Sequence, residues 1–365
     1  MLRLLGMFIG LAIFLAPAAL FAGEGQKSEV ISLYKSYRAS LKEGKSEAAL
    51  KFAEQMYALT PGAFGKISKT HATATFNLAQ INDLLKNHKA AAELYQEHVD
   101  ILNKLKVPKD KRYLAKLGLL SAAYMKINKI DEAITYGQKA VGLAKDLKLP
   151  DDILAVYELK LGIYYYLSYG KGRRAKQHIN KAVDLFTEVY GNNDTKTAWA
   201  IFWRAKLDMG FKKNRRAAKE FEHVLDIYNK KLDAGDDRIL QVHAFLVNIY
   251  EKLGEKEKST QHCIAVATER PTGFDRDLDP LYKITPTYPY WAQTARMSGY
   301  VIAEFTVDEF GQVRDIKTIG GKNIKYFEKN AYKALSQFRY APTIRDGKRV
   351  KTEGVKHKIT FMMVK

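Results

Sequence analysis

The chain has 365 residues, a formal net charge of +20 at pH 7 and a single cysteine, Cys263. Hydrophobic residues make up 47% of it and aromatic residues 12%, which is enough apolar material for packed cores and excludes a disordered chain. One cysteine excludes an internal disulfide framework, and nine prolines exclude a long proline-rich spacer. At about 100 to 200 residues per domain, the length allows two or three domains.

The N-terminus has the pattern of a secretory signal. Arg3 precedes an uncharged apolar run up to Leu15, and the small residues Ala18 and Ala22 offer cleavage points after it. We therefore expect a signal peptide over residues 1–22 that is cleaved after Ala22. The alternative is an uncleaved membrane anchor, because residues 4–21 reach the lower length limit of a membrane-spanning helix.

A 42-residue repeat fills residues 26–271. Small residues recur at this period, and each opens a segment with apolar residues at helical spacing. Turn-tolerant residues precede most of them, and residue types typical of helix N-caps recur at the same period. The pattern predicts six helix pairs. The small residues are Ala49, Ala91, Ala133, Ala175, Ala217 and Ser259, the turn residues are Gly44, Lys86, Asn128, Gly170, Lys212 and Gly254, and the caps are Ser68, Asp110, Asp152, Asp194 and Asp236.

Positive charge gathers where the second helices of repeats four and five begin. Arg173 and Arg174 are followed 42 residues later by Arg215 and Arg216. Cations are unfavourable at a helix N-terminus because the helix dipole is positive there. Two interpretations stay open, a solvated face and a ridge that binds an anionic partner such as an acidic protein segment or peptidoglycan. The secretory signal argues against nucleic acid as the partner.

The sequence contains no recognisable catalytic or metal-binding motif. Its eight histidines lack the i, i+4 pairing of a metal site, and no phosphate-binding loop or nucleophile motif is present. We therefore expect no enzymatic activity, no cofactor and no metal site.

A different pattern begins after Pro271. Residues 272–287 are typical of a linker, and residues 288–365 predict a small domain. Apolar residues alternate on both sides of a turn at residues 308–311, recur at helical spacing over residues 327–338 and alternate again in the last strand. The predicted fold is an all-α helical repeat solenoid followed by a small α+β domain.

Both parts resemble known families. The helix pairs resemble tetratricopeptide repeats of a 42-residue kind, which implies a superhelix whose concave groove binds peptides or proteins. The end of the chain resembles the C-terminal domain of TonB, although Phe338 stands where many members have tryptophan. The resemblance rests on Tyr288-Pro289, Ala292, Gly299, Val301, Phe305-Thr306-Val307-Asp308, Gly311, Val313, Ala331, Ala334-Leu335, Phe338, Tyr340, Pro342 and Gly347.

The TonB resemblance implies a periplasmic domain that binds outer-membrane TonB-dependent transporters. Binding would occur by β-augmentation, in which an extended peptide adds itself to an exposed edge strand. The implied contact residues are Val355, His357, Ile359 and Phe361 in the last strand and Ile284, Thr285, Pro286 and Thr287 before the Tyr-Pro motif.

These observations together predict a periplasmic adaptor for TonB-dependent outer-membrane transport. One alternative is an energy transducer of the TonB type that is anchored in the inner membrane. A further alternative is an envelope scaffold that binds the cell wall. Retention of the leader would distinguish the anchored transducer from the adaptor.

Overall fold

The computed structural model describes residues 16–269 and 279–363, with residues 16–23 described by their backbone alone. The chain divides into two compact units, residues 1–175 and residues 176–365. Most of the predicted leader and part of the predicted linker lie outside the described residues. Among the described helices, none combines the length and the apolar character needed to cross a membrane.

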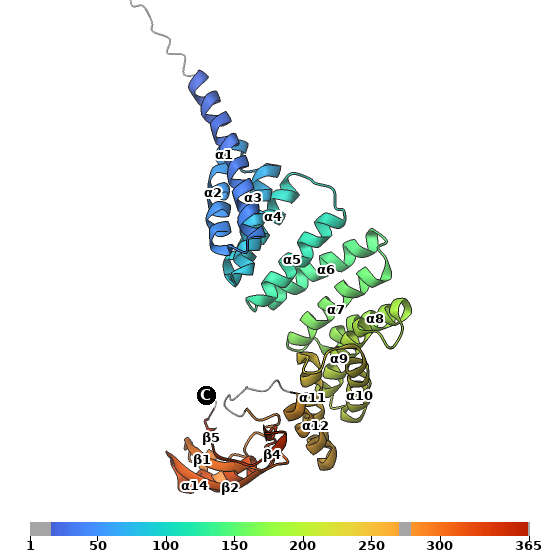
Figure 1. Cartoon of the computed structure of the whole chain (residues 1–365), viewed down its shortest axis with the longest axis vertical. Coiled ribbons are helices and arrows are strands. Elements are labelled where there is room, and N and C mark those ends of the chain that lie inside the picture. The colour runs from blue at the N-terminus through green and yellow to red at the C-terminus, as the bar shows by residue number, and fades with distance from the viewer. Residues whose placement is uncertain (1–15, 270–278, 364–365) are drawn as a thin grey trace, which may run out of the picture. The chain divides into compact units, whose positions relative to one another are not determined.

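The first unit is a series of antiparallel helices, each packed on the next along the chain (Figure 1). Its helices are α1 (Ala16–Lys42), α2 (Ser46–Phe64), α3 (Lys69–Leu84), α4 (His88–Lys104), α5 (Lys111–Lys126), α6 (Ile130–Asp146) and α7 (Asp151–Leu167), and α8 (Gly172–Tyr190) spans the boundary between the units. The second unit continues the series with α9 (Thr195–Gly210), α10 (Asn214–Lys231), α11 (Asp237–Leu253) and α12 (Lys256–Glu269).

The second helix of each pair begins 42 residues after the one before it. The small residue predicted near its start is fully buried in all six cases, which allows the two helices of a pair to approach closely. The residue predicted to form the turn has a positive φ in all six cases, including Lys86, Asn128 and Lys212. A left-handed residue therefore reverses the chain within each pair, whether or not it is glycine.

Four of the five predicted N-caps occupy that position. Ser68, Asp110, Asp194 and Asp236 each accept a hydrogen bond from a backbone N–H in the first turn of the following helix. The prediction was wrong for Asp152, which lies inside the first turn of α7. Pro150 caps that helix instead, and its carbonyl accepts from the N–H groups of Ile153 and Leu154.

The C-terminal domain is a small antiparallel sheet with one helix packed on it. The strand order is β2-β1-β5, and β3 and β4 form a separate two-stranded hairpin. The helix α14 packs against β1 and β2. The elements are α13 (Tyr290–Thr294), β1 (Gly299–Val307), β2 (Val313–Lys322), α14 (Ile324–Leu335), β3 (Thr343–Arg345), β4 (Lys348–Val350) and β5 (Thr352–Phe361).

Alternation along β1 builds the core of this domain. Val301, Ala303, Phe305 and Val307 are buried on one face, and the residues between them are partly exposed on the other. Phe327 and the small residues of α14 complete the core. A helix therefore covers one face of the sheet, and the edge strands remain at its sides.

Candidate functional site

The strand β5 lies at an edge of the three-stranded sheet. It pairs with β1 on one side only, with Gly299 opposite Phe361 and Phe305 opposite Val355. Within the described residues, no strand pairs with its other side. An edge of this kind presents a row of unpaired N–H and C=O groups to a partner.

The register shows which residues of β5 direct their backbone groups outward. The Asp308 N–H donates to the Gln312 carbonyl at 2.9 Å, so residue 308 faces β2. Along an antiparallel strand, the backbone N–H and C=O groups of successive residues point to alternate sides. Both irregularities in the pairing of β1 with β2 add their extra residue to β2, so the alternation along β1 is not interrupted. Even-numbered residues of β1 therefore face β2, and odd-numbered ones face β5.

The same alternation applies across the pairing of β1 with β5. Odd-numbered residues of β1 pair with odd-numbered residues of β5, because Val301 lies opposite Ile359 and Ala303 opposite His357. The backbone groups of Lys356, Lys358 and Thr360 therefore point away from the sheet. All three side chains are exposed.

The four residues of β5 that were expected to contact a partner are the odd-numbered ones, which alternate with the outward-facing residues. Ile359 is 5% exposed and Phe361 2% exposed, and both lie in the core. Val355 also packs against the core, and the ring of His357 contacts Phe338. Their backbone groups pair with β1. The strand therefore lies where the resemblance implies, but its accessible groups are those of the intervening residues.

The segment Ile284–Thr287 lies near β5. Burial, joined by the nearby charge of Lys283, lowers the pKa of His357. The Tyr288 ring contacts Phe361 edge to face at 5.8 Å. Ile284 packs against the core, and the Thr287 carbonyl accepts a hydrogen bond from Asn330. The structure thus places the two residues that flank this segment, Lys283 and Tyr288, near β5.

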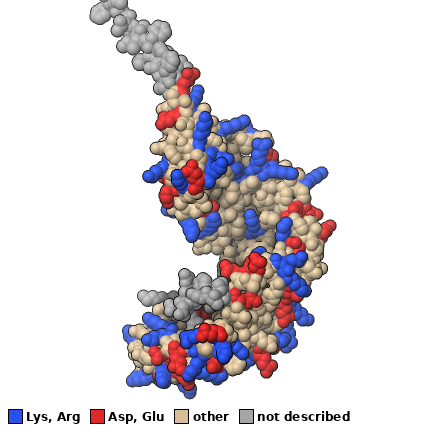
Figure 2. All heavy atoms as spheres, in the orientation of Figure 1, with Lys and Arg blue, Asp and Glu red and all other residues tan. Residues whose placement is uncertain are grey.

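The predicted basic ridge consists of Arg173, Arg174, Arg215 and Arg216, and a buried carboxylate neutralises part of its charge. Arg216 forms an ion pair with Asp208, whose side chain is buried, so this guanidinium already has an anionic partner. Arg215 lines an open cavity of about 420 Å³ together with Lys219 and Lys258. In the first unit, the Arg174 guanidinium lies 5.8 Å from the Tyr165 ring centroid, and Arg173 is exposed. Acidic side chains are interspersed among the basic ones on the face shown in Figure 2.

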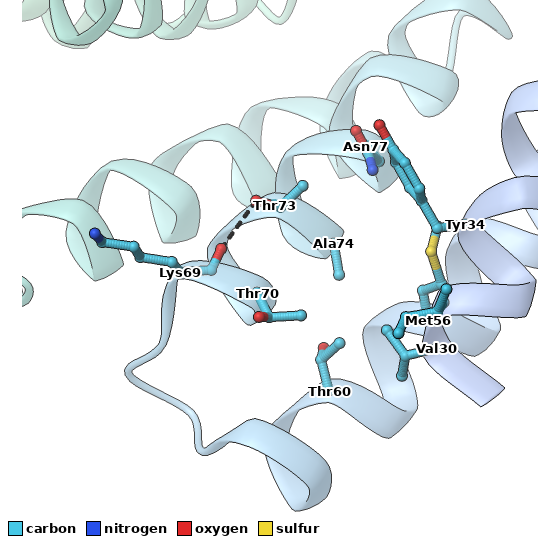
Figure 3. A pocket seen from close by; sticks show the side chains of 10 residues that line it. Val30, Tyr34, Met56, Thr60, Lys69, Thr70, Thr73, Ala74 and Asn77 are labelled. Carbon is cyan, nitrogen blue, oxygen red and sulfur yellow. Dashed lines mark hydrogen bonds between the residues drawn. The ribbon is translucent and has the colours of Figure 1, made fainter. Parts of the chain in front are cut away.

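A pocket of about 300 Å³ opens between α1, α2 and α3 (Figure 3). Asn77 and Tyr34 lie at one end of it and Thr60 at the other. Asn77 is 8% exposed, and its Nδ2 has no hydrogen-bond partner among the described residues. The pocket thus combines an apolar wall with a donor that can bind a carbonyl oxygen. Its lining residues are Val30, Ile31, Tyr34, Met56, Thr60, Lys69, Thr70, Thr73, Ala74 and Asn77.

Polar contacts between neighbouring helices do not follow from sequence spacing. The Nδ1 atoms of His243 and His262 lie 2.8 Å apart, and burial lowers the pKa of His262 to about 4. Thr60 Oγ1 lies 2.8 Å from His71 Nδ1. Within the described part of the chain, no group of three or more His, Cys, Asp and Glu side chains could hold a metal ion. The only signal of these buried polar groups in the sequence is a polar residue on the otherwise apolar face of a helix, such as Asn77 in α3.

Comparison with known proteins agrees with this fold. Residues 284–363 match the model of the family described as Gram-negative bacterial TonB protein C-terminal. These residues form a TonB C-terminal domain. Protein TonB of Pseudomonas aeruginosa is 29% identical over 82 residues, which are 22% of this chain and 24% of that protein. The similarity is thus confined to one end of the chain, here called the TonB-like domain (residues 284–363).

The helices form a TPR-like repeat array. BtubC (BKLC) from P. vanneervenii aligns with a TM-score of 0.50 and 16% identity, over 72% of this chain and 98% of that one. The apo form of RapI aligns with a TM-score of 0.52 and 13% identity, over 69% of each chain. TPR-like repeats of a Podosopora anserina kinesin light chain align with a TM-score of 0.49 and 17% identity, over 56% of this chain and 98% of that one. The chain therefore joins an array of helix pairs to a domain that matches the TonB C-terminal family.

Proposed function

We propose that this protein is a periplasmic adaptor for TonB-dependent outer-membrane transport. The TonB-like domain binds an extended segment of a transporter along β5, and the helical array binds a second envelope protein. The observation that carries this proposal is the outer side of β5, where three consecutive outward-facing residues lie exposed at the edge of the sheet. Both kinds of module are typical of proteins that act through protein interaction.

The chemistry of β5 suits an extended peptide. Each outward residue offers one N–H and one C=O, and each hydrogen bond formed with a peptide contributes about 0.5 to 1.5 kcal/mol net. Lys356 and Lys358 add positive charge along the same edge. Lys356 lies 3.7 Å from Glu304, and the Lys358 ammonium lies 4.2 Å from the Tyr300 ring centroid. Both lysines therefore lie over the exposed face of the sheet, which leaves the edge open for a partner with acidic side chains.

The pocket between α1, α2 and α3 is the candidate site for the second partner. Its apolar wall takes an apolar side chain, and Asn77 Nδ2 donates to a peptide carbonyl that passes over it. Leaving this buried donor without a partner costs about 1 to 3 kcal/mol, so a ligand that accepts from it gains affinity.

The location in the periplasm rests on the predicted removal of residues 1–22. Intact-mass measurement of the protein from soluble and membrane fractions of a Gram-negative host tests it. A soluble species that lacks the leader is expected. The full mass in the inner membrane would instead support the anchored energy transducer.

A proline at Lys358 tests the edge-strand site. Proline is tolerated on an edge strand when the N–H it removes faces outward, so Lys358→Pro should fold and lose one hydrogen bond to the peptide. The probe is a set of synthetic peptides from the periplasmic segments of the host's TonB-dependent transporters. The dissociation constant should rise about two- to thirteenfold, as expected for the loss of one hydrogen bond worth about 0.5 to 1.5 kcal/mol.

Two further variants separate the backbone from the side chain. Lys358→Ala keeps the N–H and should bind within about twofold of wild type, since it removes only an exposed side chain. Ile359→Pro removes an N–H that faces β1 and should disrupt the domain itself. Unchanged binding by a folded Lys358→Pro variant would refute the proposal.

A further inference from the structure

Arg339 extends from the TonB-like domain into the last helix pair. It follows α14 in the chain and is 5% exposed. Its Nε lies 3.2 Å from Glu251 Oε1 on α11, and its Nη2 donates to Thr260 Oγ1 on α12. The same Nη2 lies 3.4 Å from the Phe310 carbonyl in the turn between β1 and β2. One guanidinium thus connects two helices of the array with the sheet.

The backbone around Arg339 is held on two sides. Its N–H donates to the Tyr282 carbonyl at 3.1 Å, and its carbonyl accepts from the Leu281 N–H at 2.7 Å. The next residue, Tyr340, donates to the Gly311 carbonyl at 2.9 Å. Because these bonds fix the chain beneath it, the side chain is presented to the helices in a defined direction.

Apolar contacts also join α12 to the C-terminal domain. Val266 and Ala267 of α12 form a buried cluster with Ala341, and Leu240 and Leu281 pack against it. Cys263 of α12 is fully buried nearby.

The turn at Gly311 closes tightly over this contact. A Cβ built on Gly311 would lie 2.0 Å from the Tyr340 carbonyl oxygen and 3.5 Å from the Cys263 Cβ. Gly311 has a φ of +75°, so both its conformation and its neighbours require glycine. The closeness of the turn to Cys263 shows that the sheet covers this part of α12.

We propose that the surface of α11 and α12 is a docking site for the TonB-like domain of the same chain, with Arg339 as its anchor. A partner bound along β5 is then held in a fixed orientation to the last helix pair rather than on a free tether. This goes beyond the proposed function, because it concerns how the two modules are coupled and holds whatever peptide β5 binds.

The docked surface leaves the candidate binding edge accessible. The contacts with the helices come from Gly311 in the turn, from Arg339 and Ala341, from β3 and from Leu281. Gly311 lies in the turn that follows the end of the sheet where Val307 is opposite Thr352. Lys356, Lys358 and Thr360 continue along β5 toward the opposite end, and their side chains are exposed. Docking and peptide binding therefore use different parts of the domain.

Because the side chains of Arg339 and Glu251 are both buried, removing the charge of either one should weaken docking. The side chains of Arg339 and Glu251 are 6% and 8% exposed, so neutralising one leaves the other buried without a counter-charge. Loss of one partner of a buried pair shifts an equilibrium by roughly 100-fold or more, whereas replacing both by apolar groups can be neutral. The covalent connection makes docking intramolecular, so a modest interface can still be occupied.

The single cysteine provides a direct readout of docking in the full-length protein. The rate at which N-ethylmaleimide modifies Cys263 should be low in wild type. Glu251→Gln and Arg339→Met should each raise it roughly 100-fold, and Arg339→Met with Glu251→Met should raise it less than either single variant. Arg314→Ala serves as the control, because Arg314 is an exposed cation whose ion-pair partner, Asp308, lies in the same hairpin, so the substitution should leave the rate unchanged.

Hydrogen exchange distinguishes undocking from unfolding. In the two single variants, exchange should increase in α12 and in the turn at residues 308–311, while β1 keeps its protection. Loss of protection in β1 would mean that Arg339 and Glu251 support the fold of the domain, and the proposal would be overturned. Rapid modification of Cys263 in wild type, or unchanged rates in both single variants, would also overturn it. None of these results depends on peptide binding by β5.

Discussion

Replacing His98 by glutamine should reduce the acid sensitivity of the first unit. His98 is 5% exposed, its Nδ1 lies 2.8 Å from the Ala72 carbonyl, and its Nε2 is buried without a hydrogen-bond partner among the described residues. Burial lowers the pKa of His98 to about 4; the hydrogen bond to Ala72 opposes this shift, and the charge of Lys116 adds to it.

The sign and size of the effect follow from linkage. An unfolded histidine has a pKa of about 6.5, so between pH 6.5 and pH 4 the unfolded state binds a proton that the folded state does not. Stability is therefore lost as the pH falls through this window. With a folded pKa of about 4, His98 accounts for a loss of about 2 kcal/mol between pH 7.5 and pH 5.

Urea unfolding followed by circular dichroism measures this loss. His98→Gln does not titrate and can still donate to the Ala72 carbonyl, so the free energy of unfolding should fall by about 2 kcal/mol less in the variant than in wild type over the same pH range. Burial also lowers the pKa of His71, which leaves some pH dependence in both proteins. Parallel stability curves for the two proteins would refute the reasoning.

Three other substitutions test the helix pairs through the free energy of unfolding. Lys212 has a φ of 59°, so Lys212→Gly should stabilise the protein by about 0.5 to 1 kcal/mol. Gly44 has a φ of 71°, so Gly44→Ala should destabilise it by about 1 kcal/mol. The opposite signs would contradict the role of the left-handed turn. Asp110→Ala should cost about 1 kcal/mol because its carboxylate accepts from the N–H groups of Arg112 and Tyr113, and no change in the unfolding midpoint would argue against the cap.

The helical array could be predicted well because its signals are local and repeated. A buried alanine at Ala91 or Ala133 is visible as a small residue on an apolar helix face, and each neighbouring repeat supplies an independent example. The error at Asp152 arose because Pro150 also suits a helix start, and only the backbone shows which of the two caps α7. Spacing alone does not distinguish two nearby residues that can both begin a helix.

The site was less predictable because it depends on pairing between distant strands. Alternation identified Ile359 and Phe361 as one face of β5, but the side on which their backbone bonds form follows from the register with β1. Likewise, Arg216 is an unpaired cation in the sequence and the partner of buried Asp208 in the structure. Arg339, between buried Phe338 and Tyr340, gave no sign that Glu251 would lie beside it.

Residue-resolved hydrogen exchange of β5, with and without a transporter peptide, tests the central claim most directly. Addition of the peptide should slow exchange of the outward N–H groups of Lys356, Lys358 and Thr360. The N–H groups of His357 and Ile359, already bonded to β1, should change little. Bound peptide with unchanged exchange at Lys356, Lys358 and Thr360 would contradict β-augmentation at this edge.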